Sequence, residues 1–460
     1  MSSITGNGNL RVGVSNRQIL KMALPISFGI LVPQLNFITN NIFLGHLHNT
    51  GPESANALST AGITGVYYLI FAAIGYGLNN GLQALISRRA GENRTGEIGR
   101  LFTQGIGISM GIAALGILIT YLVAPTLMEM SIKDPAIRDQ AIEYLKIRIW
   151  GLPFLYIYQM RNALLVGTNQ SKYLVAGTIA EALSNVFFDY VFIFGKWGFP
   201  NLGFNGAAVA SIIAEFLGMA VVFWVIHLKG IGKRFALFSN LTFDAKNTRL
   251  ILQQSSPLIF QHAISIISWE FFYILIERNQ QSRHDLAISN TMRNIFGLFG
   301  MFSWAFAATC NSMVSNIIGQ GLQERVPELI RKIVRLSTGS AIFICIILNI
   351  FPELFLSIYG QGDEFIQTAL PVVRVVSLAL VLMSFGTVWL NAVTGTGNSR
   401  VNLLIEFITI IIYSAYVYVV FEWLHLPIVI GWMSEWLYWS FMFAMSYFYI
   451  RSGKWKGKVI

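Results

Sequence analysis

Long apolar segments recur along almost the whole chain, separated by short polar stretches. Roughly 20 mostly apolar residues cross a bilayer core about 30 Å thick as a helix, because a helix satisfies its own backbone polar groups. On this rule the pattern predicts twelve membrane spans. They cover residues 19–44, 58–87, 101–128, 141–166, 173–195, 206–228, 250–276, 286–317, 333–358, 365–393, 403–421 and 428–450. We therefore predict an all-α, multi-pass membrane protein whose first span is retained rather than cleaved as a signal peptide.

The composition agrees with a chain that lies mostly in lipid. Of its 460 residues, 54% are hydrophobic and only 12% are charged, whereas soluble proteins carry about 25% charged residues. The net charge of +10 would suggest a nucleic-acid partner for a cytosolic domain. On a membrane protein, cationic loops beside anionic headgroups explain it. We therefore expect membrane lipid, and no nucleic acid, as a partner.

Lysine and arginine are distributed unevenly between the two sides that this topology defines. With both termini cytoplasmic, 22 of the 32 Lys and Arg residues fall in cytoplasmic segments and 6 in external ones. Cytoplasmic loops of membrane proteins carry such an excess of positive charge. We therefore expect cytoplasmic termini and a location in the cell (cytoplasmic or inner) membrane.

Two short motifs occur twice, at the same separation. Ser87–Gly91 recurs as Ser315–Gly319, and Gly167–Lys172 recurs as Gly395–Arg400, in both cases 228 positions later. Many transporters consist of two related bundles around a central site. The common order and spacing of the two pairs therefore predict an internal repeat.

The repeat divides the chain into two lobes of six spans each. We expect an N-lobe at residues 1–228, a cytoplasmic linker at 229–249 and a C-lobe at 250–460. An even number of spans gives both halves the same orientation, so the implied pseudo-twofold axis runs along the membrane normal. We expect the chain to act as a monomer.

Together these motifs resemble the multidrug and toxic compound extrusion (MATE) family. The resemblance covers Leu24-Pro25 with Pro33, the run Gly-Leu-Gln-Ala-Leu-Ile-Ser-Arg-Arg-Ala-Gly that ends at Gly91, the paired Gly-Thr elements, Phe194–Gly203 and Gly206–Ser211. It implies two six-helix lobes forming a V, with a central cavity between them. It also implies export of small organic, cationic, drug-like or toxic compounds, driven by inward H+ or Na+.

Glu181, Asn185 and Asp189 recur every four residues in the fifth span and therefore share one helical face. An ionisable side chain costs at least about 2.5–3.5 kcal/mol at the centre of a span, so each needs a partner or a task. The stripe could bind a proton, coordinate Na+ through oxygens, or hydrogen-bond a neighbouring helix. Asn185-x-x-x-Asp189 is similar to a motif of the family's DinF-like branch, which implies an N-lobe cation site.

The first span departs from the family pattern. The family usually has a carboxylate just before the end of this span, whereas this chain has Asn40 and Asn41. Asn40 can ligate a cation or hydrogen-bond Asp189, but an amide does not accept a proton near neutral pH. Asn36 lies one turn earlier and extends the polar face towards the substrate, unless the two amides pack between helices.

Glu270 is the main candidate in the C-lobe. The family often has a glutamate eight residues after the seventh-span proline and a second one five residues later. Counted from Pro257, these positions are Ser265 and Glu270, so only the second carboxylate is present. Glu270 is predicted to bind a proton or the substrate. His262 could share that proton and Trp269 could line a cavity for planar cations, although both are also ordinary packing residues.

Other charged residues within the predicted spans have open roles. Glu215 and Glu435 occupy similar positions in the sixth and twelfth spans, which favours a shared structural role. Glu406 is interpreted as a salt-bridge partner that locks its lobe.

A flippase for lipid-linked glycans is the alternative function. It would suit the same two-lobe fold with a cavity lined by arginine, and Arg161, Arg293 and Arg374 lie within spans. An enzyme is not indicated, because the sequence has no HExxH, nucleophile elbow, P-loop or dinucleotide motif. A channel is not indicated either, because no filter or ring motif occurs.

We therefore predict a cation-coupled antiporter that works by alternating access, in which external cation binding to a lobe carboxylate favours substrate release. H+ is favoured over Na+, because Asn40 removes one charged oxygen from a sodium cage. Neither a cofactor nor a bound metal is expected. Cys310 and Cys345 lie in apolar stretches without a CxxC or His-rich tract, so no disulfide or zinc site is predicted.

Overall fold

The computed structural model describes residues 10–46, 57–132, 134–239, 241–279, 284–357 and 363–460, and these residues form helices and no strand. The first half contains α1 (Asn16–His46), α2 (Ala57–Gly91), α3 (Thr95–Ser131), α4 (Pro135–Arg148), α5 (Leu152–Gly167), α6 (Leu174–Phe194), α7 (Gly203–Leu228) and α8 (Ile231–Arg234). The second half contains α9 (Ala245–Asn279), α10 (Asp285–Gly319), α11 (Val326–Ile350), α12 (Pro352–Ser357), α13 (Asp363–Gly395), α14 (Ser399–Tyr418), α15 (Ile428–Trp432) and α16 (Ser434–Arg451).

Every predicted span has a helix at its position. Nine helical segments of the described chain are long and apolar enough to cross a membrane on length and composition alone. Four predicted spans are not single α-helices as expected. The fourth is divided by the 3-10 turn Ile149–Gly151, the ninth ends its long helix before Pro352, the eleventh finishes in a π-helical turn at Val419–Trp423, and the twelfth is divided at Met433. Pro352 lacks a backbone N–H and therefore favours the first turn of a new helix.

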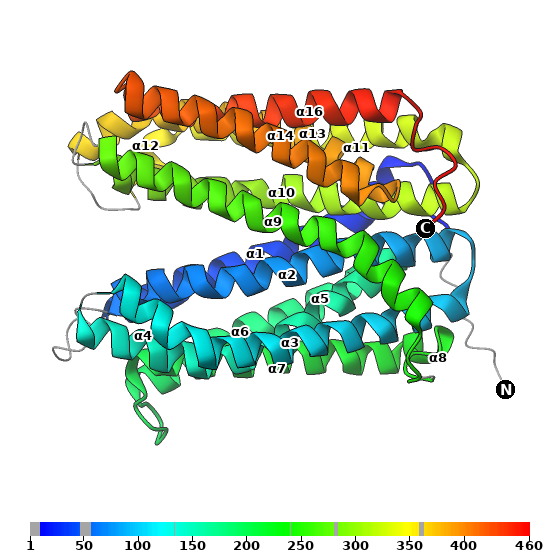
Figure 1. Ribbon diagram of the computed structural model, residues 1–460, viewed down its shortest axis with the longest axis horizontal. Helices are drawn as coiled ribbons and strands as arrows, with labels where there is room; N and C mark the ends of the chain where they lie inside the picture. The colour runs from blue at the N-terminus through cyan, green and yellow to red at the C-terminus, as the bar shows by residue number, and fades with distance from the viewer. Residues whose placement is uncertain (1–9, 47–56, 133, 240, 280–283, 358–362) are drawn as a thin grey trace.

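The two halves of the chain form two layers of helices (Figure 1). In that view α10 to α16 lie above α1 to α7, α9 crosses from the upper layer to the neighbourhood of α8, and most helix axes run along the long dimension of the molecule. The first described residues, the C-terminus and α8 lie at the same end, hereafter the termini end. The predicted linker, residues 229–249, contains α8 and the first residues of α9. The exact lobe boundaries stay a prediction.

The lobes touch where α2 and α10 cross. A Cβ atom added to Gly91 would lie 2.1 Å from the Asn316 carbonyl oxygen, and one added to Gly319 would lie 2.3 Å from the Arg88 carbonyl oxygen. Gly319 follows Gly91, and Asn316 follows Arg88, by the 228 positions of the sequence repeat. The two contacts are therefore exchanged by one pseudo-twofold axis.

Hydrogen bonds across the crossing of α2 and α10 are also related by the repeat of 228 residues. Gln83 Nε2 donates a hydrogen bond to the Ala308 carbonyl oxygen at 2.8 Å, and Asn311 Nδ2 donates one to the Asn80 carbonyl oxygen at 3.1 Å. A shift of 228 positions relates the two donors, Gln83 and Asn311, and likewise the two acceptors, Asn80 and Ala308. Each lobe therefore donates one of the two bonds and accepts the other. The predicted arrangement of two related lobes is thus confirmed at the level of individual contacts.

The second repeated motif holds equivalent helices together inside each lobe. A Cβ atom at Gly167 would lie 2.8 Å from Ile86, and one at Gly395 would lie 3.0 Å from Val314. Gly167 ends α5 against α2, whereas Gly395 ends α13 against α10. Both repeated glycines are therefore present because two helices approach too closely for a side chain.

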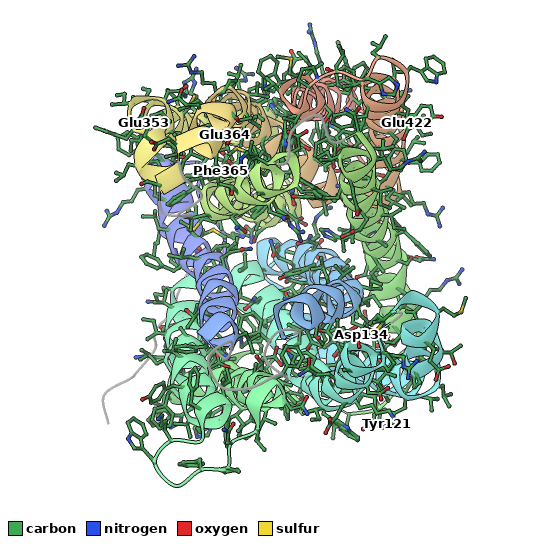
Figure 2. The ribbon with its side chains drawn as sticks, turned by 90° about the vertical axis from the view of Figure 1, so that its left-hand side faces the viewer. Tyr121, Asp134, Glu353, Glu364, Phe365 and Glu422 are labelled. Atoms are coloured by element: carbon green, nitrogen blue, oxygen red, sulfur yellow. The ribbon has the colours of Figure 1, made fainter. Side chains whose placement is uncertain are left out.

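Figure 2 looks onto the end opposite the termini. Asp134, Glu353, Glu364 and Glu422 lie at this end. Glu422 forms an ion pair with Arg278, whose Nε lies 3.3 Å from Glu422 Oε1. The termini end instead carries the basic segments that the sequence predicts to be cytoplasmic.

We predict that Gly91→Ala and Gly319→Ala each lower the thermal stability of the purified protein. The added methyl group meets a backbone carbonyl, so α2 and α10 must separate to admit it. Overpacking of this kind typically costs about 1–3 kcal/mol, and a Tm measurement in detergent would detect it. Gly107→Ala in α3 is the control, because a Cβ atom there meets nothing within 4 Å. Equal Tm values for all three variants would contradict the crossing.

Candidate functional site

The polar stripe predicted in the fifth span lies on α6, inside the N-lobe. Asn185 and Asp189 are fully buried, with exposed fractions of 2% and 0%. Glu181 is half-buried, and its Oε2 atom is inaccessible and has no hydrogen-bond partner among the described residues. A Cβ atom at Gly218 of α7 would lie 2.9 Å from Glu181 Cβ, so α7 covers the stripe directly.

A buried ion pair lies beside the stripe and joins α4 to α7. Arg148 Nη1 donates to Glu215 Oε2 at 3.1 Å, and Arg148 Nη2 donates to Glu215 Oε1 at 2.5 Å. The guanidinium carbon lies 4.0 Å from the centroid of the Tyr68 ring of α2, which places the charge over an aromatic face. A Cβ atom at Gly151 would lie 2.2 Å from Arg148 Nη1, so the glycine leaves room for the pair. Glu215 is therefore held by an arginine rather than by backbone amides.

Arg161 of α5 is the second buried cation of this lobe. Its side chain is 0% exposed. Nη1 donates to the Gly218 carbonyl oxygen at 3.1 Å, and the guanidinium carbon lies 4.0 Å from the Tyr158 ring centroid. Arg161 also attracts Glu181 electrostatically. It is thus bound into the lobe rather than free to bind a ligand.

The N-lobe interior therefore contains more acids than bases. Three carboxyl groups, those of Glu181, Asp189 and Glu215, lie among two guanidinium groups, those of Arg148 and Arg161. If every group were ionised, the described interior would carry one uncompensated negative charge. An isolated charge is very costly in a low-dielectric medium, so this charge balance is unfavourable when all five groups are ionised.

The C-lobe holds its buried acids differently. Glu406 of α14 is 1% exposed and accepts hydrogen bonds from Gln261 Nε2, at 3.3 Å, and from the Tyr438 hydroxyl. Glu435 of α16 is 4% exposed and accepts one from Trp439 Nε1 at 3.0 Å. Neither acid forms an ion pair with a described residue. The expectation that Glu406 is a salt-bridge partner is therefore wrong, because its partners are neutral.

The three predicted substrate residues of α9 do not form one cluster. His262 Nε2 lies 3.3 Å from the side-chain nitrogen of Asn80 in the other lobe. Glu270 is half-buried and lies eight residues further along α9, which is about 12 Å away along the helix axis. His262 and Glu270 therefore do not share a hydrogen bond as expected. The Trp269 ring packs on aromatic rings of its own lobe, with its centroid 5.9 Å from that of Trp432.

Asn36 and Asn40 lie in α1 but outside the residues whose side chains the structure describes. Arg293 and Arg374, which an arginine-lined flippase cavity would require, have exposed side chains on α10 and α13. Arg161 is bound within the N-lobe, so it is not available to line such a cavity.

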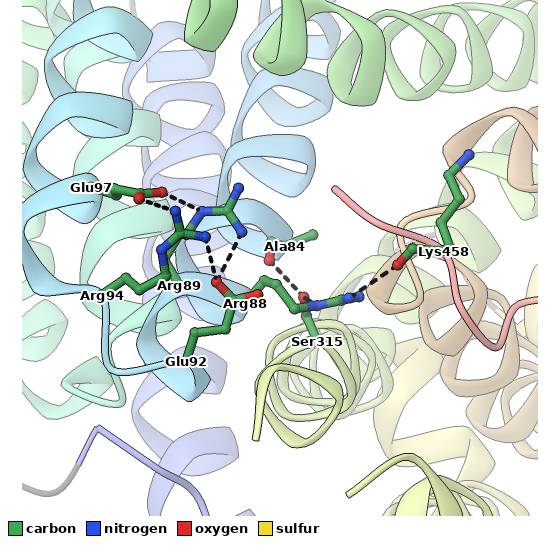
Figure 3. Close-up of polar contacts among 8 residues, drawn as sticks. All are labelled: Ala84, Arg88, Arg89, Glu92, Arg94, Glu97, Ser315 and Lys458. Carbon is green, nitrogen blue, oxygen red and sulfur yellow. Dashed lines mark hydrogen bonds and ion pairs between the residues drawn. The ribbon is translucent and has the colours of Figure 1, made fainter. Parts of the chain in front are cut away.

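One buried arginine connects the lobes at the termini end. Arg88 is 4% exposed and directs its guanidinium group entirely at the C-lobe (Figure 3). It donates to Ser315 Oγ at 3.4 Å, to the Lys458 carbonyl oxygen at 3.4 Å and to the Thr396 carbonyl oxygen at 3.3 Å. The neighbouring Arg89 instead pairs within its own lobe.

Reasoning from the sequence missed the roles of Arg148, Tyr68 and Arg88. Arg148 lies within the predicted fourth span, residues 141–166, and its partner Glu215 is 67 residues away. Arg88 lies at the end of the predicted second span, where a basic residue is typical of a cytoplasmic loop. Its place in the repeated motif Ser87–Gly91 is the signal that could have indicated an interface role.

Comparison with known proteins identifies several similar chains. The MatE family model matches residues 25–191 and 257–419. The chain is 23% identical to a "Probable multidrug resistance protein NorM" of Thermotoga maritima over 96% of its own length and 94% of that protein. It is 31% identical to the protein of the same description in Halalkalibacterium halodurans over 52% of each chain.

The fold also matches a solved structure described as the outward-facing conformation of a multidrug resistance MATE family transporter of the MOP superfamily. The TM-score is 0.86 at 16% sequence identity, and 98% of each chain is covered. At this identity the likeness concerns the fold alone.

We predict that Arg88→Ala loosens the termini end, whereas Arg89→Ala does not. Spin labels at Gly96→Cys and Leu322→Cys, in a Cys345→Ser background, would report the distance between the lobes. Loss of the Arg88 hydrogen bonds, each worth about 1.5–3 kcal/mol because the donor is charged, should broaden that distance distribution towards longer values.

Arg89→Ala is a matched control, because Arg89 pairs with Glu92 at 3.1 Å and with Glu97 at 2.9 Å, both in the N-lobe. The same distribution in the Arg88 variant and the unsubstituted protein would contradict a role for Arg88 in joining the lobes.

Proposed function

Since the chain belongs to the multidrug and toxic compound extrusion (MatE) family, we propose that it exports small organic cations by proton-coupled antiport. As a member it is a multi-pass membrane transporter and not an enzyme. The names of its relatives support drug-like or toxic compounds as substrates. The proposal places it in the cytoplasmic or inner membrane as a monomer, with the basic termini end in the cytoplasm.

The observation that carries the proposal is the charge balance of the N-lobe. Three buried or half-buried carboxyl groups share the lobe with two guanidinium groups. Glu215 already pairs with Arg148. Asp189, with Asn185 beside it, and Glu181 are therefore the groups that take up the coupling ion.

A proton suits these groups better than Na+. Hard metal cations need a shell of several oxygen ligands, whereas a proton needs a single carboxyl oxygen. Asn40 in place of a carboxylate reduces the charge available for a metal further.

Alternating access supplies the transport step. Proton uptake from outside changes the charge of the N-lobe interior and shifts the population towards the state that releases substrate outward. Glu270, half-buried on α9, is the acidic group proposed to attract a cationic substrate, with Asn36, Trp269 and His262 as further contacts. Apart from the coupling ion, the proposal requires neither cofactor nor metal.

Reconstituted protein in liposomes with an acidic lumen should accumulate a fluorescent organic cation from outside. Asp189→Asn and Glu181→Gln should each reduce this uptake at least about tenfold, because a neutral side chain removes the excess charge that binds the proton. Glu270→Gln should raise the apparent KM for the cation instead.

Glu353→Gln is the matched acidic control, because Glu353 is exposed at the opposite end of the molecule and should leave uptake unchanged. A parallel experiment with a sodium gradient at equal pH distinguishes the ions. The proposal fails if both N-lobe variants keep gradient-driven uptake at unchanged Tm, or if sodium alone drives it.

A further inference from the structure

A groove opens on the surface of the C-lobe near the termini end, between the start of α9 and the start of α14. It has a volume of about 400 Å³, and its lining includes Phe243, Arg249, Leu252, Pro257 and Arg400. A smaller recess of about 210 Å³ adjoins it, shares Arg400 and reaches Lys458 of the C-terminal tail. The export mechanism proposed above uses neither space.

The end of the groove nearest the termini is basic. Arg249 and Arg400 have exposed side chains, and neither forms a hydrogen bond or ion pair with any residue that the structure describes. No acidic residue lines either space. Two guanidinium groups without acidic partners match the phosphate geometry that arginine recognises through paired hydrogen bonds.

The rest of the groove runs along the helix and is mostly apolar, with Gln253 and Ser256 as polar lining residues. Leu252 is 41% exposed and Phe243 is 76% exposed. Pro257 lies eight residues beyond Arg249 on α9, which is about 12 Å along the helix axis. A basic site at the end of a helix, with an apolar wall leading towards the bilayer centre, has the charge and shape profile of a phospholipid.

We propose that this groove binds an anionic glycerophospholipid, with its phosphate between Arg249 and Arg400 and an acyl chain along Leu252 and Pro257. The lipid comes from the leaflet that faces the termini end. Basic pockets between transmembrane helices recognise anionic headgroups in this manner.

The bound lipid stabilises the closed termini end. Thr248 lines the groove and donates a hydrogen bond to Gln104 Oε1 of the N-lobe at 3.2 Å. Lys458 borders the adjoining recess, and its carbonyl oxygen accepts a hydrogen bond from Arg88. The groove is therefore bordered on two sides by contacts between the lobes, and its ligand binds best when those contacts are formed.

Native mass spectrometry of protein extracted from phosphatidylcholine vesicles containing phosphatidylglycerol tests the lipid site. The unsubstituted protein should retain phosphatidylglycerol in preference to phosphatidylcholine. The double variant Arg249→Gln/Arg400→Gln should retain about tenfold less phosphatidylglycerol. Arg331→Gln/Arg335→Gln removes the same charge from exposed positions on α11 and should retain as much as the unsubstituted protein.

Three results would overturn the lipid site. Equal losses in both double variants would indicate unspecific attraction to the surface. Undiminished retention in the Arg249/Arg400 variant would place the lipid elsewhere. Displacement of the lipid by glycerol 1-phosphate at equal concentration would indicate a site for soluble phosphates instead.

A second inference concerns Glu406 and rests on separate contacts. Its carboxyl group lies where α9, α14 and α16 meet, bonded to Gln261 and the Tyr438 hydroxyl. Ser265 of α9 also hydrogen-bonds Tyr438, and Glu435 acts electrostatically on the same hydroxyl group. From the helices packed on it, no cationic group of the described chain reaches Glu406.

We infer that Glu406 is a proton-binding group of the C-lobe. A buried carboxylate with only neutral donors is costly as an anion, whereas the protonated acid needs one hydrogen-bond acceptor. Rotation of the Gln261 amide would supply its oxygen as that acceptor. The adjacent His262 contacts Asn80 of the N-lobe, so proton binding at Glu406 acts on the helix that meets the other lobe.

Infrared difference spectra across a pH titration would detect this proton without any transport measurement. A carbonyl stretch of a protonated carboxyl group should disappear in Glu406→Gln and shift in Tyr438→Phe, which removes one hydrogen bond. Glu435 is a second buried acid with a neutral donor, so Glu435→Gln is the matched comparison: it should leave in place the band that is sensitive to Tyr438→Phe and remove at most a band of its own. Persistence of the band in Glu406→Gln, or its loss only in Glu435→Gln, would refute the assignment whether or not the N-lobe couples export to protons.

Discussion

The close approach of α2 and α10 is the constraint on which the rest of the structure depends. Gly91 and Gly319 bring a backbone carbonyl of the opposite helix within about the distance that a methyl group would occupy. Inside a membrane, lipid tails are as apolar as leucine, so helices associate through small residues and interhelical hydrogen bonds rather than through the hydrophobic effect. Because these contacts come in pairs exchanged by a twofold axis, the crossing relates the two lobes symmetrically, and the packing of α2 on α9 and of α1 on α10 extends the same interface.

The two lobes share a backbone arrangement but not a chemistry. In the N-lobe, buried acids lie beside guanidinium groups, and Arg148 forms a bidentate pair with Glu215. In the C-lobe, Glu406 and Glu435 accept hydrogen bonds from neutral side chains. A buried ion pair is strongly destabilised when one partner is lost, whereas a neutral donor tolerates a change in protonation of its acceptor. The two lobes can therefore respond to protons at different points of the transport cycle.

Much of the fold could be predicted from the sequence, because bilayer thickness fixes the length of each apolar run and the repeat fixes their pairing. The spacing of Glu181, Asn185 and Asp189 likewise placed them on one buried face. The turn at Ile149–Gly151 was not predicted, because the span was assigned from its length and average hydropathy, although Gly151 and Pro153 mark the position of the break. Partners of buried charges were also beyond reach. Glu406 was expected to pair with a cation, but its surroundings depend on how three helices from distant parts of the sequence come together.

The kind of contact at the lobe interface bears directly on whether the lobes can part. Arg88 is bound there by carbonyl and hydroxyl oxygens, and water can replace such partners of a charged group at a net cost of about 1.5–3 kcal/mol each. The Arg148–Glu215 pair lies within one lobe, where breaking it would cost about 3–5 kcal/mol. Contacts between the lobes can thus be exchanged for contacts with water, whereas contacts within a lobe are costly to break. This difference favours rigid-body motion of one lobe relative to the other over deformation of a lobe. A binding event of modest free energy is then sufficient to shift the balance between two such states.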